Sequence, residues 1–146
     1  MEPGTNRVGR SAFGIAPAQK AAAILVAEDN SDSREMLKVL LSSKGYGVIE
    51  AADGVQAVEV ALTKLPDLIF LDLQLPRLDG LGVSRNLRQH PKLRSVPIVV
   101  ISGYGTDQHR QSSFDAGCND YLLKPIDFER LEEILKTFVP LSNSEV

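Results

Sequence analysis

Short apolar runs that alternate with helix-like segments are the feature that most constrains the fold of this chain. The apolar runs have the length of strands and lie at residues 22–27, 46–51, 67–72, 96–102 and 120–123. The helix-like segments lie at residues 31–45, 53–64, 80–90, 107–117 and 127–139. This alternation predicts an α/β fold, in which five helices cover both faces of one five-stranded parallel sheet.

The same pattern predicts the domain boundaries. Residues 21–140 are expected to form one domain, because no internal repeat or second domain is visible in the 146 residues. Residues 1–20 are rich in Gly, Pro, Ala and Ser and predict a flexible N-terminal tail. Residues 141–146 predict a shorter C-terminal tail.

The helical segments differ in how clearly they show an apolar face. Met36, Val39 and Leu40 have helical spacing in the first segment. The last segment has the clearest amphipathic pattern, formed by Phe128, Leu131, Ile134, Leu135 and Phe138. Residues 107–117 are mostly polar and predict a helix with little apolar surface.

Composition limits the classes of function. Hydrophobic residues make up 43% of the chain and charged residues 24%, as in soluble globular proteins. The net charge of -3, without a basic stripe, argues against direct binding to nucleic acid. No apolar stretch approaches the length that spans a membrane. The single cysteine, Cys118, cannot form an internal disulfide and fits a reducing compartment, so we expect a cytoplasmic location.

Polar residues follow four of the five predicted strands. Glu28 and Asp29 follow the first, Asp72 ends the third, Ser102 ends the fourth and Lys124 follows the fifth. The carboxyl ends of parallel strands share one edge of the sheet, so these side chains should converge there. Converging carboxylates repel each other unless a cation such as Mg²⁺ neutralises them. A carboxylate nucleophile beside a metal, an ammonium and a hydroxyl has the components for moving a phosphoryl group onto Asp72.

The sequence resembles the receiver domain of two-component response regulators over about Ala22 to Val139. The resemblance rests on the motifs "LVAEDN", "FLDLQLPRLDG", "VVISGYG" and "YLLKP", which occur in order, each at a predicted strand end. It implies a flavodoxin-like, doubly wound sheet with strand order 2-1-3-4-5. It also implies a phosphoprotein that accepts a phosphoryl group in a phosphorelay and is not a turnover enzyme on an external substrate.

The resemblance assigns the metal site and the phosphoacceptor. Asp72 matches the phosphorylated aspartate. Asp29 matches the direct Mg²⁺ ligand, and Glu28 matches the second acidic residue, which acts largely through water. The backbone carbonyl of Gln74 matches the position that completes the site, in which Mn²⁺ could replace Mg²⁺.

The resemblance also assigns the residues that sense the phosphoryl group. Ser102 and Lys124 match the hydroxyl and the ammonium that bond its oxygens. Tyr121 matches an aromatic that changes rotamer on phosphorylation, as Ser102 is pulled inward and makes room for the ring to turn in. Pro125 matches a proline that often follows a cis peptide bond. The fourth helix, fifth strand and fifth helix would form the face that a partner reads, and a homodimer through this face would also fit.

Four positions depart from the common family pattern or vary within it. Ser102 replaces a frequent threonine and keeps the hydroxyl, while Gly103 replaces a frequent alanine and should leave the phosphoryl pocket open. Gln74 and Tyr104 occupy variable positions that tune the lifetime of the acyl phosphate in the family. Residue roles also have plainer alternatives, since Ser102 could be an ordinary loop hydroxyl and Tyr121 could simply pack.

The resemblance implies a sensor histidine kinase or a histidine phosphotransfer domain as the phosphodonor, and a downstream protein as the reader. We expect a stand-alone single-domain response regulator, with a receiver from a hybrid sensor kinase as the alternative. A receiver-like scaffold that works without phosphorylation is a second alternative, although the acidic pair, Asp72 and Lys124 are all present. A phosphatase resembling the haloacid dehalogenases would need a second aspartate where Gln74 stands.

Overall fold

The computed structural model describes residues 21–141, and the predicted tails lie outside this range except for Leu141. The strands are β1 (Ala23–Ala27), β2 (Gly47–Ala51), β3 (Leu68–Asp72), β4 (Ile98–Ser102) and β5 (Asp120–Leu123). The helices are α1 (Ser31–Ser43), α2 (Gly54–Lys64), α3 (Gly80–Arg88), α4 (Asp107–Asp115) and α5 (Phe128–Phe138). A short 3-10 helix, η2 (Pro91–Leu93), precedes β4 and was not predicted from the sequence.

The five strands form one parallel sheet in the order β2-β1-β3-β4-β5. This arrangement confirms the predicted α/β fold and the strand order that the resemblance implied. All five residues of β3 and all five of β4 are buried, because these strands lie inside the sheet and are covered on both faces. Their continuous apolar sequences follow from this double burial.

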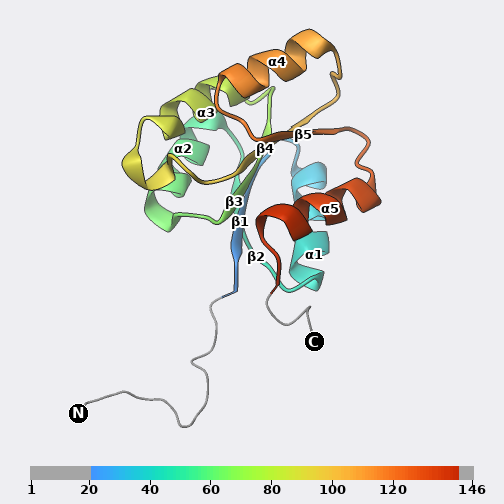
Figure 1. The fold of residues 1–146 in the computed structure, drawn as a ribbon. Helices are drawn as coiled ribbons and strands as arrows, with labels where there is room; N and C mark the ends of the chain where they lie inside the picture. The colour runs from blue at the N-terminus through green and yellow to red at the C-terminus, as the bar shows by residue number, and fades with distance from the viewer. Residues whose placement is uncertain (1–20, 142–146) are drawn as a thin grey trace, which may run out of the picture.

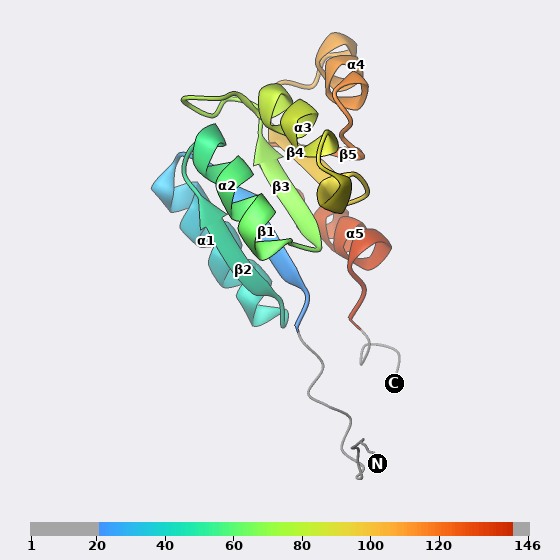
Figure 2. The same cartoon turned by 90° about the vertical axis from the view of Figure 1, so that its left-hand side faces the viewer.

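The helices cover the sheet in two layers, which Figures 1 and 2 show from two sides. Helices α1 and α5 share one core with one face of the sheet, and Leu37, Leu41 and Leu131 lie in it. Helices α2 and α3 cover the opposite face, where Ala57 and Val83 are fully buried. Helix α4 lies beside α3 in Figure 1 and contacts β5.

A side-chain cap fixes the start of every helix from α1 to α5. In each case an oxygen of the residue before the helix accepts a hydrogen bond from a backbone N–H of the first turn, which satisfies a donor that has no partner inside the helix. The capping residues are Asn30, Asp53, Asp79, Thr106 and Asp127. These caps explain why the predicted helix starts agree closely with the structure.

The apolar face of α1 differs from the sequence prediction. Leu37 and Leu41 are the buried residues of this helix, whereas Met36 and Val39 are 45% and 58% exposed. The segment "MLKVLL" contains apolar residues on more than one helical face, and packing against the sheet selects among them. In α5 the predicted Leu131, Ile134 and Leu135 are buried, whereas the prediction for Phe128 was wrong, since this first residue of the helix is 57% exposed.

Gly80 allows the loop after β3 to return closely to the strand that carries Asp72. A Cβ atom at residue 80 would lie 2.5 Å from the carbonyl oxygen of Asp72, closer than Cβ atoms approach other heavy atoms. The N–H of Gly80 also donates to the carbonyl oxygen of Leu73 at 2.9 Å. The glycine therefore holds α3 against the end of β3 and helps to fix the position of Asp72.

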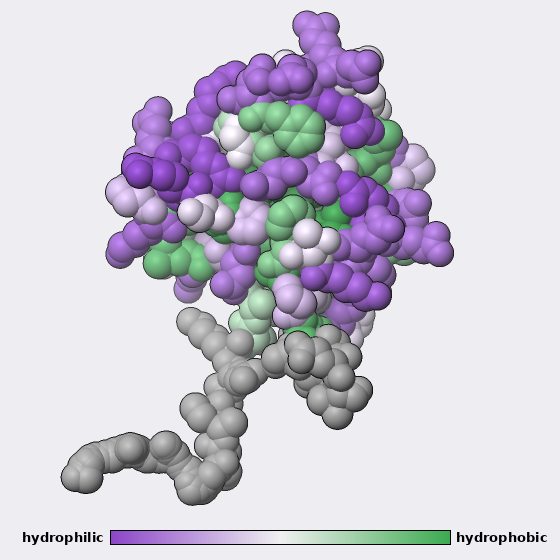
Figure 3. All heavy atoms as spheres, in the orientation of Figure 1, coloured by the Kyte–Doolittle hydropathy of each residue, from purple (hydrophilic) through white to green (hydrophobic). Residues whose placement is uncertain are grey.

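The face of the molecule in Figure 3 is mostly hydrophilic, and its hydrophobic residues form small separate groups. Within residues 21–141, no helix combines the length and the apolar composition needed to cross a bilayer.

Candidate functional site

The sheet register brings the predicted site residues to one edge. Ala27, the last residue of β1, pairs with Leu71 of β3, so Glu28 follows at the level of Asp72. Asp72 pairs with Ile101 of β4, and Ser102 follows. Lys124 comes directly after β5. The four elements therefore end side by side, as the polar strand ends predicted.

Three carboxylates converge at this edge. Oxygens of Glu28, Asp29 and Asp72 lie within 4.8 Å of one another. Glu28 and Asp72 are buried, with exposed fractions of 3% and 7%, whereas Asp29 is exposed. Burial raises the pKa of Glu28, the hydrogen bond from Lys124 partly opposes this shift, and the nearby charge of Asp72 adds to it.

Lys124 bridges the two buried carboxylates. Its Nζ donates to Glu28 Oε1 at 2.9 Å and to Asp72 Oδ2 at 3.1 Å. Burial disfavours the ammonium, but the hydrogen bonds with Glu28 and Asp72 together outweigh this effect and raise the pKa of Lys124. The lysine is therefore held in its charged form with two of its three N–H groups directed at the site.

The donor set suits a hard divalent cation. Within residues 21–141, Lys124 is the cationic side chain that pairs with this cluster, through Glu28 and Asp72, so three carboxylates share one positive charge. Carboxylate oxygens are the ligands that Mg²⁺ prefers, and Mg²⁺ commonly uses one or two of them together with water and a phosphate. The backbone N–H of Gln74 donates to Asp72 Oδ1 at 2.9 Å, which fixes the orientation of that carboxylate.

Ser102 lies beside Asp72 with its hydroxyl already oriented. The side chain is buried, and its Oγ accepts a hydrogen bond from the backbone N–H of Tyr104 at 3.0 Å. A hydroxyl that accepts in this way still has its own proton to donate. Ser102 could therefore donate to an oxygen of a group bound to Asp72.

Tyr121 lies inside the domain, not on its surface. The residue is 2% exposed, its hydroxyl donates to the carbonyl oxygen of Tyr104, and the guanidinium of Arg110 lies 5.0 Å from the ring centre. The structure thus describes the inward position that was expected to follow phosphorylation. Tyr121 also belongs to the core between the sheet and α2 and α3, so both the switch role and simple packing fit its position.

Two further features concern the rim of the site. The Lys124–Pro125 peptide bond is cis, as the resemblance implied. Gln74 Nε2 donates to the hydroxyl of Tyr104 at 3.0 Å, and the ring of Tyr104 stacks on His109 with centroids 5.1 Å apart. Nothing in the sequence spacing of His109 predicts this contact with Tyr104.

Comparison with known proteins identifies the family. Residues 24–136 match the family model described as the response regulator receiver domain. The chain belongs to this family. Four quoted sequence motifs had indicated the same family, and the match confirms that interpretation.

Curated relatives of this receiver domain differ in length. It is 29% identical over 116 residues to the polar-differentiation response regulator DivK of Brucella anthropi. The aligned region covers 80% of this chain and 94% of DivK. It is 35% identical over 108 residues to the DNA-binding dual master transcriptional regulator RpaA of Synechocystis sp., which covers 74% of this chain and 45% of RpaA. The chain therefore spans less than half of the RpaA relative.

Solved structures show the same fold. The receiver domain of the sensor histidine kinase PA1611 of Pseudomonas aeruginosa PAO1, solved with a magnesium ion coordinated in its active site cleft, superposes with a TM-score of 0.77 at 35% identity. The match covers 84% of this receiver domain and 100% of the other chain. Phosphorylation and Mg²⁺ binding at an acidic pocket are general features of the receiver family, and Glu28, Asp29 and Asp72 form a cluster of carboxylates here.

Proposed function

We propose that this receiver domain accepts a phosphoryl group from a phosphohistidine onto Asp72 in a Mg²⁺-dependent reaction. The observation that carries the proposal is the convergence of a buried Asp72 with Lys124 at 3.1 Å and with the carboxylates of Glu28 and Asp29. An isolated buried carboxylate is costly, so such a cluster is expected where its charges are used.

Each side chain has a role in the transfer. A carboxylate oxygen of Asp72 forms a bond to phosphorus while the P–N bond to the donor imidazole breaks, and the electron pair of that bond stays on the imidazole nitrogen. Lys124 and the hydroxyl of Ser102 bond the phosphoryl oxygens. Glu28, Asp29, Asp72 and the carbonyl of Gln74 would hold Mg²⁺, which neutralises charge on the phosphoryl group when bound. The product is an acyl phosphate, and the protein is a phosphoacceptor, not a turnover enzyme.

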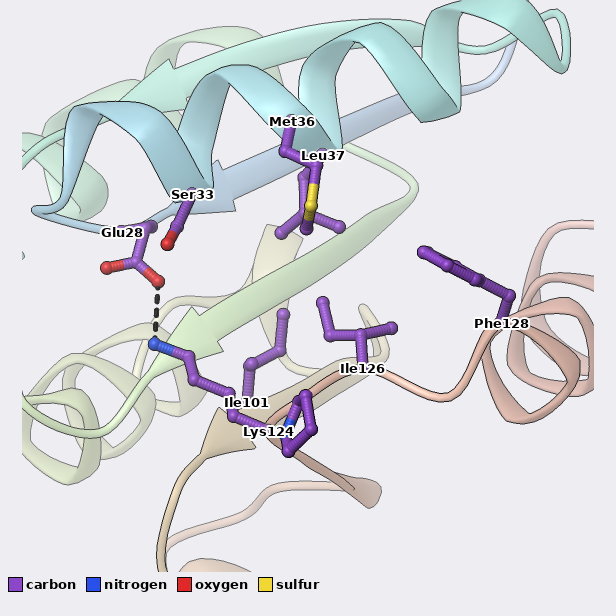
Figure 4. A pocket seen from close by; sticks show the side chains of 9 residues that line it. Glu28, Ser33, Met36, Leu37, Ile101, Lys124, Ile126 and Phe128 are labelled. Atoms are coloured by element: carbon purple, nitrogen blue, oxygen red, sulfur yellow. Dashed lines mark hydrogen bonds and ion pairs between the residues drawn. The ribbon is translucent and has the colours of Figure 1, made fainter.

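The surroundings of the site suit a donor carried on another protein. A pocket of about 340 Å³ opens next to Glu28 and Lys124 between α1 and the segment after β5. Figure 4 shows that Met36 and Leu37 line one side of the pocket and that Ile126 and Phe128 line the other. Met36 and Phe128 are 45% and 57% exposed, so apolar surface lies directly beside the charged site.

This pocket supports a protein partner that presents an apolar side chain beside its phosphohistidine. An apolar side chain of a sensor histidine kinase or a histidine phosphotransfer domain could enter it and place the phosphohistidine next to Asp72. The face formed by α4, β5 and α5 would bind the downstream protein, or a second copy of the chain, after Tyr121 and Ser102 respond to the phosphoryl group. Cytoplasmic location and the stand-alone context remain predictions.

Intact-mass spectrometry after incubation with acetyl phosphate tests the proposal. With Mg²⁺ the wild type should gain the mass of one phosphoryl group, and Asp72→Asn should gain none. Asp107→Asn is the matched control, because Asp107 is an exposed aspartate outside the site. Removal of Mg²⁺ with a chelator should abolish the adduct. Phosphorylation of Asp72→Asn to the wild-type extent would contradict the proposal.

A second arm of the experiment covers a short-lived adduct. Beryllofluoride imitates a phosphoryl group on a carboxylate, so it should bind the wild type in the presence of Mg²⁺ and should not bind Asp72→Asn. Failure of the wild type both to gain mass and to bind beryllofluoride would favour the phosphorylation-independent scaffold instead.

A further inference from the structure

Tyr104 connects the loops on both sides of the site. Its hydroxyl accepts from Gln74 Nε2 at 3.0 Å, and Gln74 stands two residues after Asp72. Its backbone N–H donates to Ser102 Oγ at 3.0 Å, and its carbonyl oxygen accepts from the hydroxyl of Tyr121. The side chain of Tyr104 therefore joins the loop after β3 to the loop after β4. Its backbone contacts Ser102 and Tyr121, two of the residues expected to sense the phosphoryl group.

The bond to Gln74 alone does not fix the ring of Tyr104. The residue is 48% exposed, so half of its surface faces solvent and the side chain would gain freedom if it left this position. The second contact is the stack on His109, with ring centroids 5.1 Å apart and an angle of 14° between the ring planes. Stacked rings of this kind contribute to the position of an otherwise exposed side chain.

His109 is in turn held by the start of α4. Its Nδ1 lies 2.5 Å from Oγ1 of Thr106, and its backbone N–H donates to the same oxygen at 3.2 Å. Thr106 is the N-cap of α4. The imidazole is thus anchored to the helix cap, and a continuous path runs from the first turn of α4 through His109 and Tyr104 to Gln74 at the rim of the site.

We propose that His109 is a positioning residue that holds Tyr104 as a lid over the phosphoryl pocket, so that the lifetime of the acyl phosphate depends on the first turn of α4. This inference rests on the function proposed above. Hydrolysis requires a water oxygen to bond to phosphorus while the bond between phosphorus and the Asp72 oxygen breaks, which releases phosphate and restores the carboxylate. A closed lid between the two loops limits the approach of that water.

The lid also couples partner binding at α4 to hydrolysis of the acyl phosphate. A partner that displaces the first turn of α4 moves His109, loosens Tyr104 and exposes the acyl phosphate to water. The reverse effect follows by thermodynamic linkage, because a closed lid favours the position of α4 that the structure describes. Partner binding at the start of α4 would therefore shorten the signal.

The test measures loss of the phosphoryl group from phosphorylated full-length protein after the phosphodonor is removed, by intact mass at fixed Mg²⁺. His109→Ala should lose the group about fivefold faster than the wild type, since one stacking contact of ordinary strength is lost. His109→Phe keeps the aromatic ring but loses the bond to Thr106, so its rate should lie closer to that of the wild type than to that of His109→Ala. Gln111→Ala is the control, because Gln111 lies on the same helix and its side chain bonds Asp115 on the exposed surface.

A double-mutant cycle separates the lid from a general loosening of α4. In the Tyr104→Ala background, which lacks the lid, His109→Ala should cause no further acceleration. The same fivefold acceleration in that background, a wild-type rate for His109→Ala, or equal rates for His109→Ala and His109→Phe would overturn the inference. Absence of any wild-type adduct, with no beryllofluoride binding, would instead refute the proposed function and the inference with it.

Discussion

Helices α4 and α5 lie on opposite faces of the sheet near β5, and they are attached to the domain in different ways. Helix α5 inserts Leu131, Ile134 and Leu135 into the core that it shares with α1 and the sheet. Among the nine described residues of α4, the buried one is Ser113. Each fully buried leucine or isoleucine contributes about 1.5–3 kcal/mol to folding, so α5 is held far more strongly by the hydrophobic effect than α4.

Polar contacts at its two ends hold α4 instead. At the C-terminal end, Ser84 Oγ donates to the carbonyl oxygen of Ala116 at 2.7 Å, and Arg88 Nε donates to that of Gly117 at 3.0 Å. At the other end, Thr106 caps the helix. Exchanging such hydrogen bonds costs less free energy than exposing an apolar core, so α4 can shift where α5 cannot. This difference suits α4 to carry a signal and α5 to keep the sheet intact.

The largest expected effect comes from removing a core side chain of α5. Leu131→Ala should lower the free energy of unfolding by about 3 kcal/mol, because it leaves a cavity between α5 and the sheet. Ser113→Ala is the corresponding change at the buried position of α4. It should cost about 1 kcal/mol, because the hydrogen bond from Ser113 Oγ to the carbonyl oxygen of His109 is lost. Urea denaturation of both variants measures these values, and equal losses would break the comparison.

The next effect concerns the C-terminal anchor of α4. Arg88→Met should cost about 2 kcal/mol, because the carbonyl oxygens of Gly117 and Leu93 and the side chain of Asn119 lose a charged donor. Burial lowers the pKa of Arg88, which agrees with a guanidinium held partly away from solvent. Arg85→Met is the control, since Arg85 is exposed and lies on α3, as Arg88 does. Equal stability of the two variants in urea would show that α4 is held by something other than this anchor.

Loss of a helix cap should reduce hydrogen-exchange protection locally in α4 and throughout the domain in α5. Thr106→Ala and Asp127→Ala each remove a side-chain cap, worth about 1 kcal/mol. In α4 the loss should raise amide hydrogen exchange locally, because this helix can open without the core. In α5 the same loss should lower the protection of the whole domain. Native-state hydrogen exchange followed residue by residue distinguishes the two patterns, and global loss in Thr106→Ala would contradict the proposed independence of α4.

The smallest effect on the free energy of unfolding is expected from a substitution in the loop between β4 and α4. A Cβ atom at Gly103 would meet no other atom within 4 Å, so Gly103→Ala should change the free energy of unfolding by less than about 0.5 kcal/mol. Thermal unfolding measures this change. A loss above 1 kcal/mol would mean that the loop leading into α4 is more constrained than its packing indicates.

The sequence predicted most of the fold because strand burial leaves a direct pattern. The runs at β3 and β4 are apolar without alternation, as strands covered on both faces must be. The buried face of α1 could not be read in the same way, since Met36 and Leu37 are both apolar and only contact with the sheet decides which one is buried. The polar sequence of α4 predicted a helix with little apolar surface. The structure agrees, because the buried residue of α4 is Ser113.

The site was predictable where it depends on the sheet and not where it depends on loops. Parallel strands place their carboxyl ends together, so the meeting of Glu28, Asp72 and Lys124 followed from residue order. The contact of Tyr104 with His109 depends on the path of a loop between a strand and a helix. No periodicity describes that path, and the sequence therefore gave no sign of the contact.

The single cysteine makes the motion of α4 directly measurable. Cys118 follows the C-terminal end of α4, is 6% exposed, and its Sγ lies 3.5 Å from Ser84 Oγ. Burial raises the pKa of this thiol, so it should react with an alkylating reagent only when the segment around it opens. Because the chain has one cysteine, every alkylated molecule reports the same event. The protein thus contains its own chemical probe for the opening of the helix that we expect to carry its signal.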